Sequence, residues 1–310
     1  MKNEHILGHG EFEAALGLPI GALDSRTRQL LDQAGLTFAK VGDAEQTQLQ
    51  DETRQAIDRG FSIVGEHRAD IWRDAWQEQL ERFEASGFDV KALNPKFVDG
   101  STVLRWQGEY IRSLSPQFEL TFMEILRDHL FRKFLSDVDS LYEFGSGSAF
   151  NVAAYAKLFP NIPIIALDWA PAAVRIADLL RERHGMKIQG RRFDFFAPSK
   201  DVVLGHGAGV LTMCALEQTG ERFGPFLDNL LGQRPRRVVH MEPTLEFYDP
   251  NSNHDRLAIE YHTRRKYLSG LLPALQELAD KGRIRIHLSR RLRFGSRFHE
   301  CFSVHVWEPV

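Results

Sequence analysis

The stretch LYEFGSGSAFN, from Leu141 to Asn151, decides the fold of this 310-residue chain. An apolar run ends in an acid, two glycines follow one residue apart, and a helix-compatible segment comes next. Glycine lets the backbone of such a strand-to-helix turn approach a ligand, and the free N–H groups of the following helix favour an anionic group. Nucleotides of several kinds bind at loops of this type, and plain turn geometry places glycines there as well.

The segments that follow Asp137 alternate between short apolar runs and helical patterns. We expect strands at 140–144, 162–167, 187–193, 208–214 and 237–241, and helices at 152–159, 171–185, 222–232 and, as one long helix, 254–279. This alternation predicts βαβ units and a parallel sheet whose carboxyl ends form one ligand-binding edge. Two alternating runs at 282–288 and 299–307 have no helix between them, which predicts a terminal β-hairpin with one antiparallel strand.

The first 136 residues have a different pattern. Apolar residues at three- and four-residue spacing predict helices at 24–36, 44–60, 68–88 and 118–135, and residues 94–101 have loop composition. In the third of these helices one apolar face is expected, made of Ile71, Trp72, Trp76, Leu80 and Phe83. The expected organisation is an N-terminal helical domain over 1–136 and an α/β domain over 137–310.

The glycines alone do not identify a ligand. No GxxxxGK motif follows, which excludes a P-loop, and Phe150 stands where a dinucleotide loop has Gly or Ala. More informative are the acids at three successive strand ends, Glu143, Asp168 and Asp194. Each alone also fits a cap or a turn. Together they suit one elongated ligand that carries an amine, a ribose and a base.

With these residues the sequence resembles the class I S-adenosylmethionine-dependent methyltransferases. The resemblance covers about residues 137–310 and implies a Rossmann-like sheet with helices on both faces, a terminal antiparallel hairpin, and S-adenosylmethionine as cofactor. Alanine replaces the third glycine of many members at Ala149. The resemblance implies that the cofactor is bound by Glu143, Gly145, Ser146, Gly147, Asp168, Trp169, Asp194, Phe195, Cys214 and Ala215.

The methyl acceptor is expected near the ends of the fourth and fifth strands, covered by the helical domain. A hydroxyl acceptor needs a base and an amine acceptor needs carboxylates, so the candidates for catalysis are Glu242, Glu217, His262, Tyr261 and His254. Each of these also fits a structural position. The Asn-Pro-Pro-Tyr motif of many base and amide N-methyltransferases is absent after the fourth strand. His240, Asp255 and their neighbours are metal-ligand types without a tight motif, so no metal is expected.

Composition and charge indicate which partners and which cellular location to expect. The net charge is −3, and arginines cluster at 234–237 and 283–297 without aromatic interleaving, which favours a solvated rim over a nucleic-acid surface. Two cysteines, a polar N-terminus and the lack of a long apolar run favour a cytoplasmic protein without a membrane segment, and a homodimer is left open.

Three functions follow. The main hypothesis is methyl transfer to a small-molecule acceptor. The alternatives are an RNA or protein methyltransferase, and a methyltransferase fold that binds cofactor without transferring methyl. A nicotinamide dehydrogenase is disfavoured by Phe150 and by the terminal hairpin.

Overall fold

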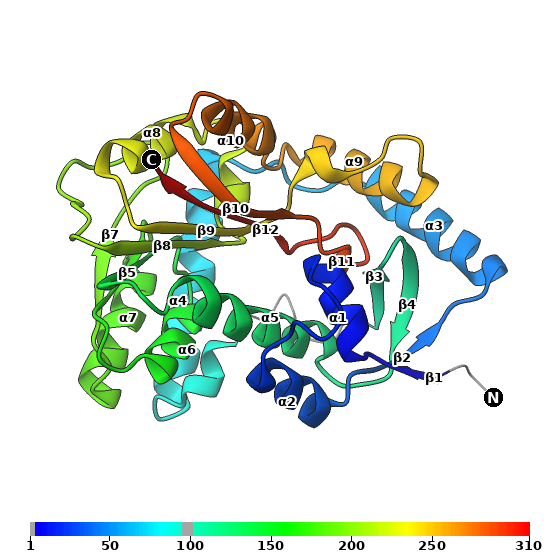
Figure 1. Ribbon diagram of the computed structural model, residues 1–310, viewed down its shortest axis with the longest axis horizontal. Coiled ribbons are helices and arrows are strands. Elements are labelled where there is room, and N and C mark those ends of the chain that lie inside the picture. Colours follow the sequence, from blue (N-terminus) through cyan, green and yellow to red (C-terminus); the bar gives the residue numbers. More distant parts are fainter. Residues whose placement is uncertain (1–3, 95–101) are drawn as a thin grey trace.

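A seven-stranded sheet forms the centre of the computed structural model, which describes residues 4–94 and 102–310 (Figure 1). Its strand order is β10-β12-β9-β8-β5-β6-β7, and only β12 runs antiparallel to its neighbours. The strands are β5 Ser140–Phe144, β6 Ile164–Asp168, β7 Ile188–Arg192, β8 Ala208–Met213, β9 Arg237–Glu242, β10 Ile284–Arg290 and β12 Ser303–Pro309. The predicted α/β fold, with parallel strands and a terminal antiparallel pair, is confirmed. Most of the loop expected at 94–101 lies outside the described residues.

Strand β5 is buried on both faces, as a central parallel strand should be. Its side chains alternate between two cores, with Leu141 on one face and Tyr142 and Phe144 on the other. Strand β7 lies at the edge and is largely exposed.

Helices cover both faces of the sheet, as predicted. Figure 1 shows α8 and α10 above it and α5, α6 and α7 below it. The helices are α5 Phe118–Phe134, α6 Phe150–Leu158, α7 Pro171–His184, α8 Gly224–Gln233, α9 Asn253–Arg265 and α10 Leu271–Asp280. The ends of α7 explain why the sequence predicts this helix. Pro171 begins it, and Gly185, with a φ of 65°, ends it.

The single long helix expected over 254–279 is wrong. The structure divides it into α9 and α10, because Lys266 adopts a φ of 52° and Gly270 a φ of 91°. The break turns Tyr267 and Leu268 inward, where both are buried. Burial of these two side chains outweighs continuation of the helix, and the apolar spacing alone did not reveal it.

The N-terminal part contains more than helices. Besides α1 His9–Leu16, α2 Ser25–Ala34, α3 Asp43–Asp58 and α4 Ala69–Ala85, it forms strands β1 Glu4–Ile6, β2 Thr37–Lys40, β3 Val103–Trp106 and β4 Glu109–Ser113. These pair in an antiparallel sheet of order β1-β2-β4-β3-β11, completed by β11 Phe294–Ser296 from the C-terminal part. The sequence did not predict this second sheet. The division into domains at residue 136 stays a prediction.

Helix α4 does not bury the whole apolar face that the spacing predicts. Leu80 and Phe83 are buried, but Ile71 is 52% exposed. Trp72 and Trp76 are half-buried, and their rings stack with centroids 5.8 Å apart. The N-terminal half of α4 thus presents two indoles to a cavity, and Trp76 also packs against the core.

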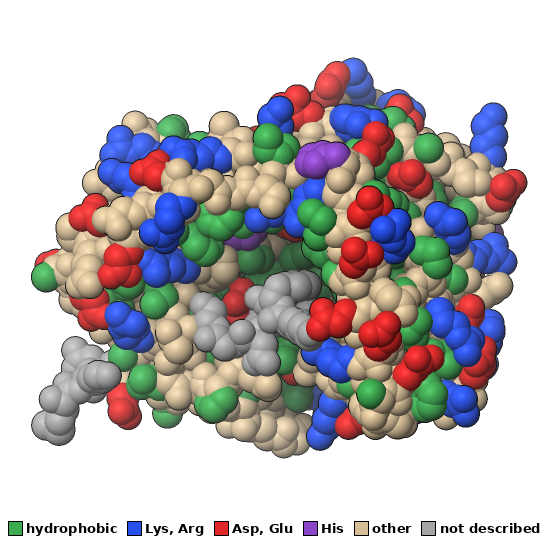
Figure 2. Space-filling view, turned by 180° about the vertical axis from the view of Figure 1, so that it is seen from behind, with side chains coloured by type: hydrophobic (Ala, Val, Ile, Leu, Met, Phe, Trp, Pro, Cys, Tyr) green, Lys and Arg blue, Asp and Glu red, His purple; other side chains and the backbone are tan. Residues whose placement is uncertain are grey.

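The arginine-rich C-terminal segments are engaged mostly within the protein. Arg236 pairs with Asp137, Arg237 with Glu308 and Arg297 with Glu52. On the face that Figure 2 shows, basic and acidic side chains are interspersed. No described helix has both the length and the apolarity that a membrane crossing requires.

Arg291 is the centre of a buried ionic network that ties α9 to the segment before β12. Its guanidinium is 11% exposed and contacts Asp255 at 2.6 Å and Glu300 at 2.6 Å. Arg105 of β3 is fully buried, donates to the backbone oxygen of His254 at 2.7 Å, and lies 3.6 Å from Asp255. The network therefore joins the two sheets.

Replacing Arg291 with methionine should lower the free energy of unfolding by about 3–5 kcal/mol, because the buried Glu300 loses its counterion and the buried Asp255 keeps only the more distant Arg105. Chemical denaturation measures this loss. Arg285→Met is the matched control, since Arg285 also pairs with a glutamate but is 65% exposed. Its loss should stay below about 1 kcal/mol. Equal losses in the two variants would contradict the central position of Arg291.

Candidate functional site

A cavity of about 360 Å³ opens at the carboxyl ends of β5, β6, β7 and β8. We call it the strand-end cavity. Seven of the ten predicted cofactor residues line it, namely Gly145, Asp168, Trp169, Asp194, Phe195, Cys214 and Ala215, together with Gly65, Glu66, Trp72, Trp76, Phe193, Phe196, Gln218 and Thr219. The structure thus brings together residues from Gly65 to Thr219, which lie far apart in the chain.

The glycines of the opening motif are required by close contacts. Gly145 has a φ of 76°, and a Cβ added there would lie 2.4 Å from the Cβ of Ala215. Gly147 has a φ of 50°, and a Cβ there would lie 2.6 Å from the ring of Trp76. Both the backbone conformation and the lack of space exclude larger residues. The loop therefore lies directly against the end of β8 and against α4.

Asp168 links the end of β6 to this loop. Its Oδ2 accepts a hydrogen bond from the Gly147 amide at 2.9 Å, and its Oδ1 accepts one from the Ala170 amide at 2.9 Å. Burial raises the pKa of this carboxyl to about 6, although the backbone hydrogen bonds oppose the shift. Each carboxylate oxygen keeps a free lone pair toward the cavity.

Asp194 differs from Asp168 in its surroundings. It is exposed, and its Oδ1 accepts from the Phe196 amide at 2.8 Å. The rings of Phe193 and Phe195 pack edge to face beside it, with centroids 5.7 Å apart. An acid next to an aromatic wall is consistent with the predicted base-binding end of the ligand.

Glu143 does not line either cavity described here. Its Oε1 accepts from the Asn151 side chain at 2.8 Å, and Asn151 in turn accepts from Arg127 at 2.9 Å. Burial raises the pKa of the Glu143 carboxyl to about 8, against the opposing effect of Asn151 and Arg127. Its Oε2 has no hydrogen-bond partner among the described residues. Glu143 supports the loop from behind, whereas the resemblance implies direct contact with the cofactor.

A second cavity of about 480 Å³ adjoins the first and shares Trp72, Trp76, Gly145, Cys214 and Gln218 with it. We call it the aromatic cavity, after the rings of Trp72, Trp76, Phe150, Tyr261, Tyr267, Phe298 and Phe302. Ser146, Gly147 and Ser148 of the glycine loop also line it. The predicted residue Ser146 therefore faces this side.

Of the five predicted catalytic residues, Glu217 and Tyr261 line the aromatic cavity. Burial, with a smaller contribution from the Glu242 carboxyl, raises the pKa of Glu217 to about 8. Gln218 donates to Glu217 at 2.8 Å. Tyr261 stacks on Phe298 with ring centroids 5.3 Å apart.

His262 is one residue removed from the cavity. Its Nε2 lies 3.1 Å from Nδ1 of His299, and His299 lines the cavity. Burial lowers the pKa of His262 to about 3 and lowers that of His299 well below its ordinary value. Both imidazoles are therefore neutral near pH 7.

Glu242 and His254 do not line either cavity. Glu242 is fully buried and accepts hydrogen bonds from the backbone amides of Ala215, Leu216 and Glu217 at 3.2–3.3 Å. It holds the short 3-10 helix Leu216–Thr219 at the end of β8. His254, in the first turn of α9, packs edge to face on Tyr110, with ring centroids 4.8 Å apart.

Sequence reasoning missed several residues of the aromatic cavity, chiefly Arg68, Glu119, Arg265, Tyr267 and His299. Glu119 lies in the helix predicted at 118–135, and the only available signal was an acid among the apolar residues of its first turn. Tyr267 was assigned to the middle of a helix. His299 was read as the start of a strand, and no sequence pattern connects it to His262.

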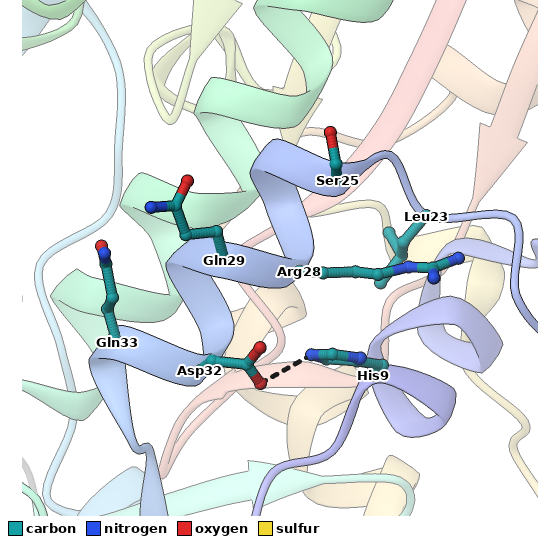
Figure 3. A pocket seen from close by; sticks show the side chains of 7 residues that line it. All are labelled: His9, Leu23, Ser25, Arg28, Gln29, Asp32 and Gln33. Atoms are coloured by element: carbon teal, nitrogen blue, oxygen red, sulfur yellow. Dashed lines mark hydrogen bonds and ion pairs between the residues drawn. The ribbon is translucent and has the colours of Figure 1, made fainter.

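The described residues outside the two cavities bear on two points, a metal site and a further hollow. Among residues 4–94 and 102–310, no group of three or more His, Cys, Asp or Glu side chains is arranged to hold a metal ion. Figure 3 shows a separate open hollow between α1 and α2, where His9 and Asp32 pair at 2.8 Å. This hollow shares no lining residue with the two cavities.

The raised pKa of Glu217 predicts how stability depends on pH. The folded chain holds a proton on this carboxyl up to about pH 8, whereas the ordinary value is 4.5, so the free energy of unfolding falls as pH rises through this interval. Glu143, with a pKa of about 8, acts in the same direction. The buried histidines oppose this trend only below their ordinary pKa of 6.5.

As pH rises from about 6.5 to 8.5, the free energy of unfolding should therefore fall less in Glu217→Gln than in the wild type. The difference between the two decreases should be about 1 kcal/mol or more. Urea denaturation at a series of pH values measures this difference. Glu221→Gln, at an exposed position of the same loop, serves as the control and should follow the wild type. An unchanged pH slope in Glu217→Gln would refute the assignment of a buried, protonated Glu217.

Comparison with known proteins finds likeness in structure but not in sequence. No protein-family model and no curated protein matches the chain. A solved structure of the 8-amino-8-demethyl-D-riboflavin dimethyltransferase RosA from Streptomyces davawensis aligns with 63% of this chain and 58% of its own, at 11% identity and a TM-score of 0.41. The pyocyanin biosynthetic protein PhzM aligns with 62% of this chain and 57% of its own, at 15% identity and a TM-score of 0.44.

The mitomycin 7-O-methyltransferase MmcR gives a similar result, with 62% of this chain, 56% of its own, 12% identity and a TM-score of 0.43. The chain thus spans less than two thirds of each of these three proteins. Likenesses this distant assign no activity.

Proposed function

We propose that the protein transfers a methyl group from S-adenosylmethionine to a small-molecule acceptor. The observation that carries the proposal is the convergence of Gly145, Asp168 and Asp194, from three successive strand ends, on one cavity of about 360 Å³. The cofactor would bind in this strand-end cavity. The acceptor would bind in the adjoining aromatic cavity.

The residues present fit such a cofactor. Gly145 lines the strand-end cavity without a side chain of its own, so a ligand there can lie close to the loop backbone. The hydroxyl of Ser146, in the glycine loop, is buried without a partner among the described residues. Unsatisfied buried polar atoms of this kind are rare in folded proteins unless a ligand or water completes them.

The chain's own residues have distinct roles in this proposal. Asp168 would accept from ribose hydroxyls while it keeps its hydrogen bond to the Gly147 amide. Trp169 and Phe195 would pack against the base, and Cys214 and Ala215 would bound the opposite side. When bound, the cofactor would supply an electrophilic methyl group on a sulfonium.

Placement of the acceptor supplies most of the catalysis of a methyl transfer. The rings of Trp72, Trp76 and Tyr261 would orient it and exclude water from the aromatic cavity. Glu217 has a pKa of about 8, within the range that suits a group which takes up or releases a proton near neutral pH. Glu242 would act through the loop it holds, as a positioning residue.

A small-molecule acceptor is favoured over RNA or protein by two features. Both cavities are walled partly by Trp72 and Trp76 of α4, so the acceptor side is bounded by a helix of the N-terminal part as well as by the strand ends. Several of the clustered arginines are paired with carboxylates of this chain, as Arg236, Arg237 and Arg291 are. A cytoplasmic location and a homodimer remain predictions from the sequence.

The cofactor assignment predicts that S-adenosylhomocysteine binds to the purified protein, as measured by isothermal titration calorimetry. Asp168→Asn should weaken the binding by about tenfold or more, because the variant loses a charge-assisted acceptor for the ribose. The absence of any binding heat in the wild type would refute the proposal.

Asp178→Asn is the matched control for this experiment. Asp178 also accepts from a backbone amide, that of Gly190 at 3.2 Å, but it lines neither cavity. Its affinity for S-adenosylhomocysteine should equal that of the wild type. If both variants lose affinity equally, Asp168 acts through the fold and not through contact with the ligand.

A further inference from the structure

The walls of the aromatic cavity suit a planar ring. Trp72 and Trp76 of α4 stand on one side, and Tyr261, Tyr267 and Phe298 come from α9 and the segments after α9 and before β12. Tyr261 lies within 5.7 Å of the Tyr267 ring and within 5.3 Å of the Phe298 ring, centroid to centroid. Aromatic rings arranged in this way favour stacking or edge contact with a further ring.

Two guanidinium groups in the same walls have no carboxylate partner. Arg68 donates to the side-chain oxygen of Gln218 at 3.2 Å, and Arg265 donates to the Tyr261 hydroxyl at 3.2 Å. Within the described part of the chain, neither forms an ion pair. The Nε atoms of both are buried without a hydrogen-bond partner there. The Nη2 group of each guanidinium forms no hydrogen bond within the described residues and is not among the buried atoms, so both side chains have donors to offer to a ligand.

The other ionisable groups of the cavity do not cancel these two charges. Arg297 also lines the cavity, but its guanidinium is paired with Glu52 at 2.9 Å. Burial raises the pKa of Glu119 to about 7 and, with the help of Glu242, that of Glu217 to about 8. Burial and the neighbouring Arg265 charge lower the pKa of Arg68. Near pH 7 the cavity therefore carries an excess of positive charge.

We propose that the acceptor carries a carboxylate on a planar aromatic framework, with the carboxylate bound between Arg68 and Arg265. Guanidinium groups bind carboxylates through charge-assisted hydrogen bonds, which are the stronger class in a partly dry cavity. A protonated Glu217 or Glu119 could donate a further hydrogen bond to the same group. A ligand with one negative charge matches the excess of positive charge in the cavity better than a dianion. The reason is that Glu119 and Glu217 begin to ionise near pH 7–8 and then reduce this excess. This substrate class rests on the proposed function.

The test uses the full chain saturated with S-adenosylhomocysteine and two probes of nearly equal shape. Cinnamate carries the carboxylate, and cinnamamide replaces it with a neutral amide. Isothermal titration calorimetry compares their affinities for the wild type, Arg68→Gln, Arg265→Gln and the control Arg73→Gln. Arg73 lies on the neighbouring turn of α4, is 57% exposed and pairs with Asp70.

We expect the wild type and Arg73→Gln to bind cinnamate about tenfold more tightly than cinnamamide. Arg68→Gln and Arg265→Gln, the two cavity variants, should each reduce the ratio of cinnamate affinity to cinnamamide affinity to about threefold or less. The affinity for S-adenosylhomocysteine should stay unchanged in both. Equal affinity for the two probes in the wild type, failure of both to bind, or a ratio unaffected by both cavity variants would each overturn the proposal.

Failure of the proposed function gives a different result. If S-adenosylhomocysteine produces no binding heat, the cofactor assignment falls. The same two probes are then compared on the protein without cofactor, where the ratio and its dependence on Arg68 and Arg265 still decide the claim about the carboxylate.

Discussion

The hydrogen bond from the Gly147 amide to the Asp168 carboxylate is the interaction on which the site depends. It joins the loop after β5 to the end of β6 and keeps the loop backbone against the cavity. Because Gly145 and Gly147 lack side chains, Ala215 on one side and Trp76 on the other can close around this loop. One short contact between neighbouring strand ends thus determines where the two cavities lie.

The aromatic cavity depends on segments that are far apart in the chain. Helix α4 supplies Trp72 and Trp76, α5 supplies Glu119, and the end of α9 supplies Tyr261 and Arg265. The Arg291 network keeps the segment before β12, which carries His299, against α9. The N-terminal and C-terminal parts of the chain therefore both contribute to one site, and the pairing of β11 with β3 joins these parts through a shared sheet.

Burial gives the interior acids an unusual charge state. Glu143 and Glu217 have pKa values raised to about 8 by loss of solvent, while the arginines around them stay charged. This asymmetry exists because a carboxyl group can become neutral near pH 7, whereas a guanidinium cannot. A cavity that contains acids and arginines in similar numbers can consequently be positive. Counting formal charges along the sequence gives no indication of this.

Much of the α/β domain was predictable from sequence because its strands are short apolar runs set between helical patterns, as at 140–144 and 171–185. The cofactor candidates Gly145, Asp168 and Asp194 were found for the same reason, since each follows directly from the end of a strand. The second sheet, the break at Gly270 and the pairing of His262 with His299 depend on contacts between distant residues, and no local pattern records them. The sequence by itself determined the parallel sheet and its ligand-binding edge, because periodicity and strand ends are local properties. Only the tertiary structure decided which side chains face the aromatic cavity and which of them remain charged, because both depend on burial.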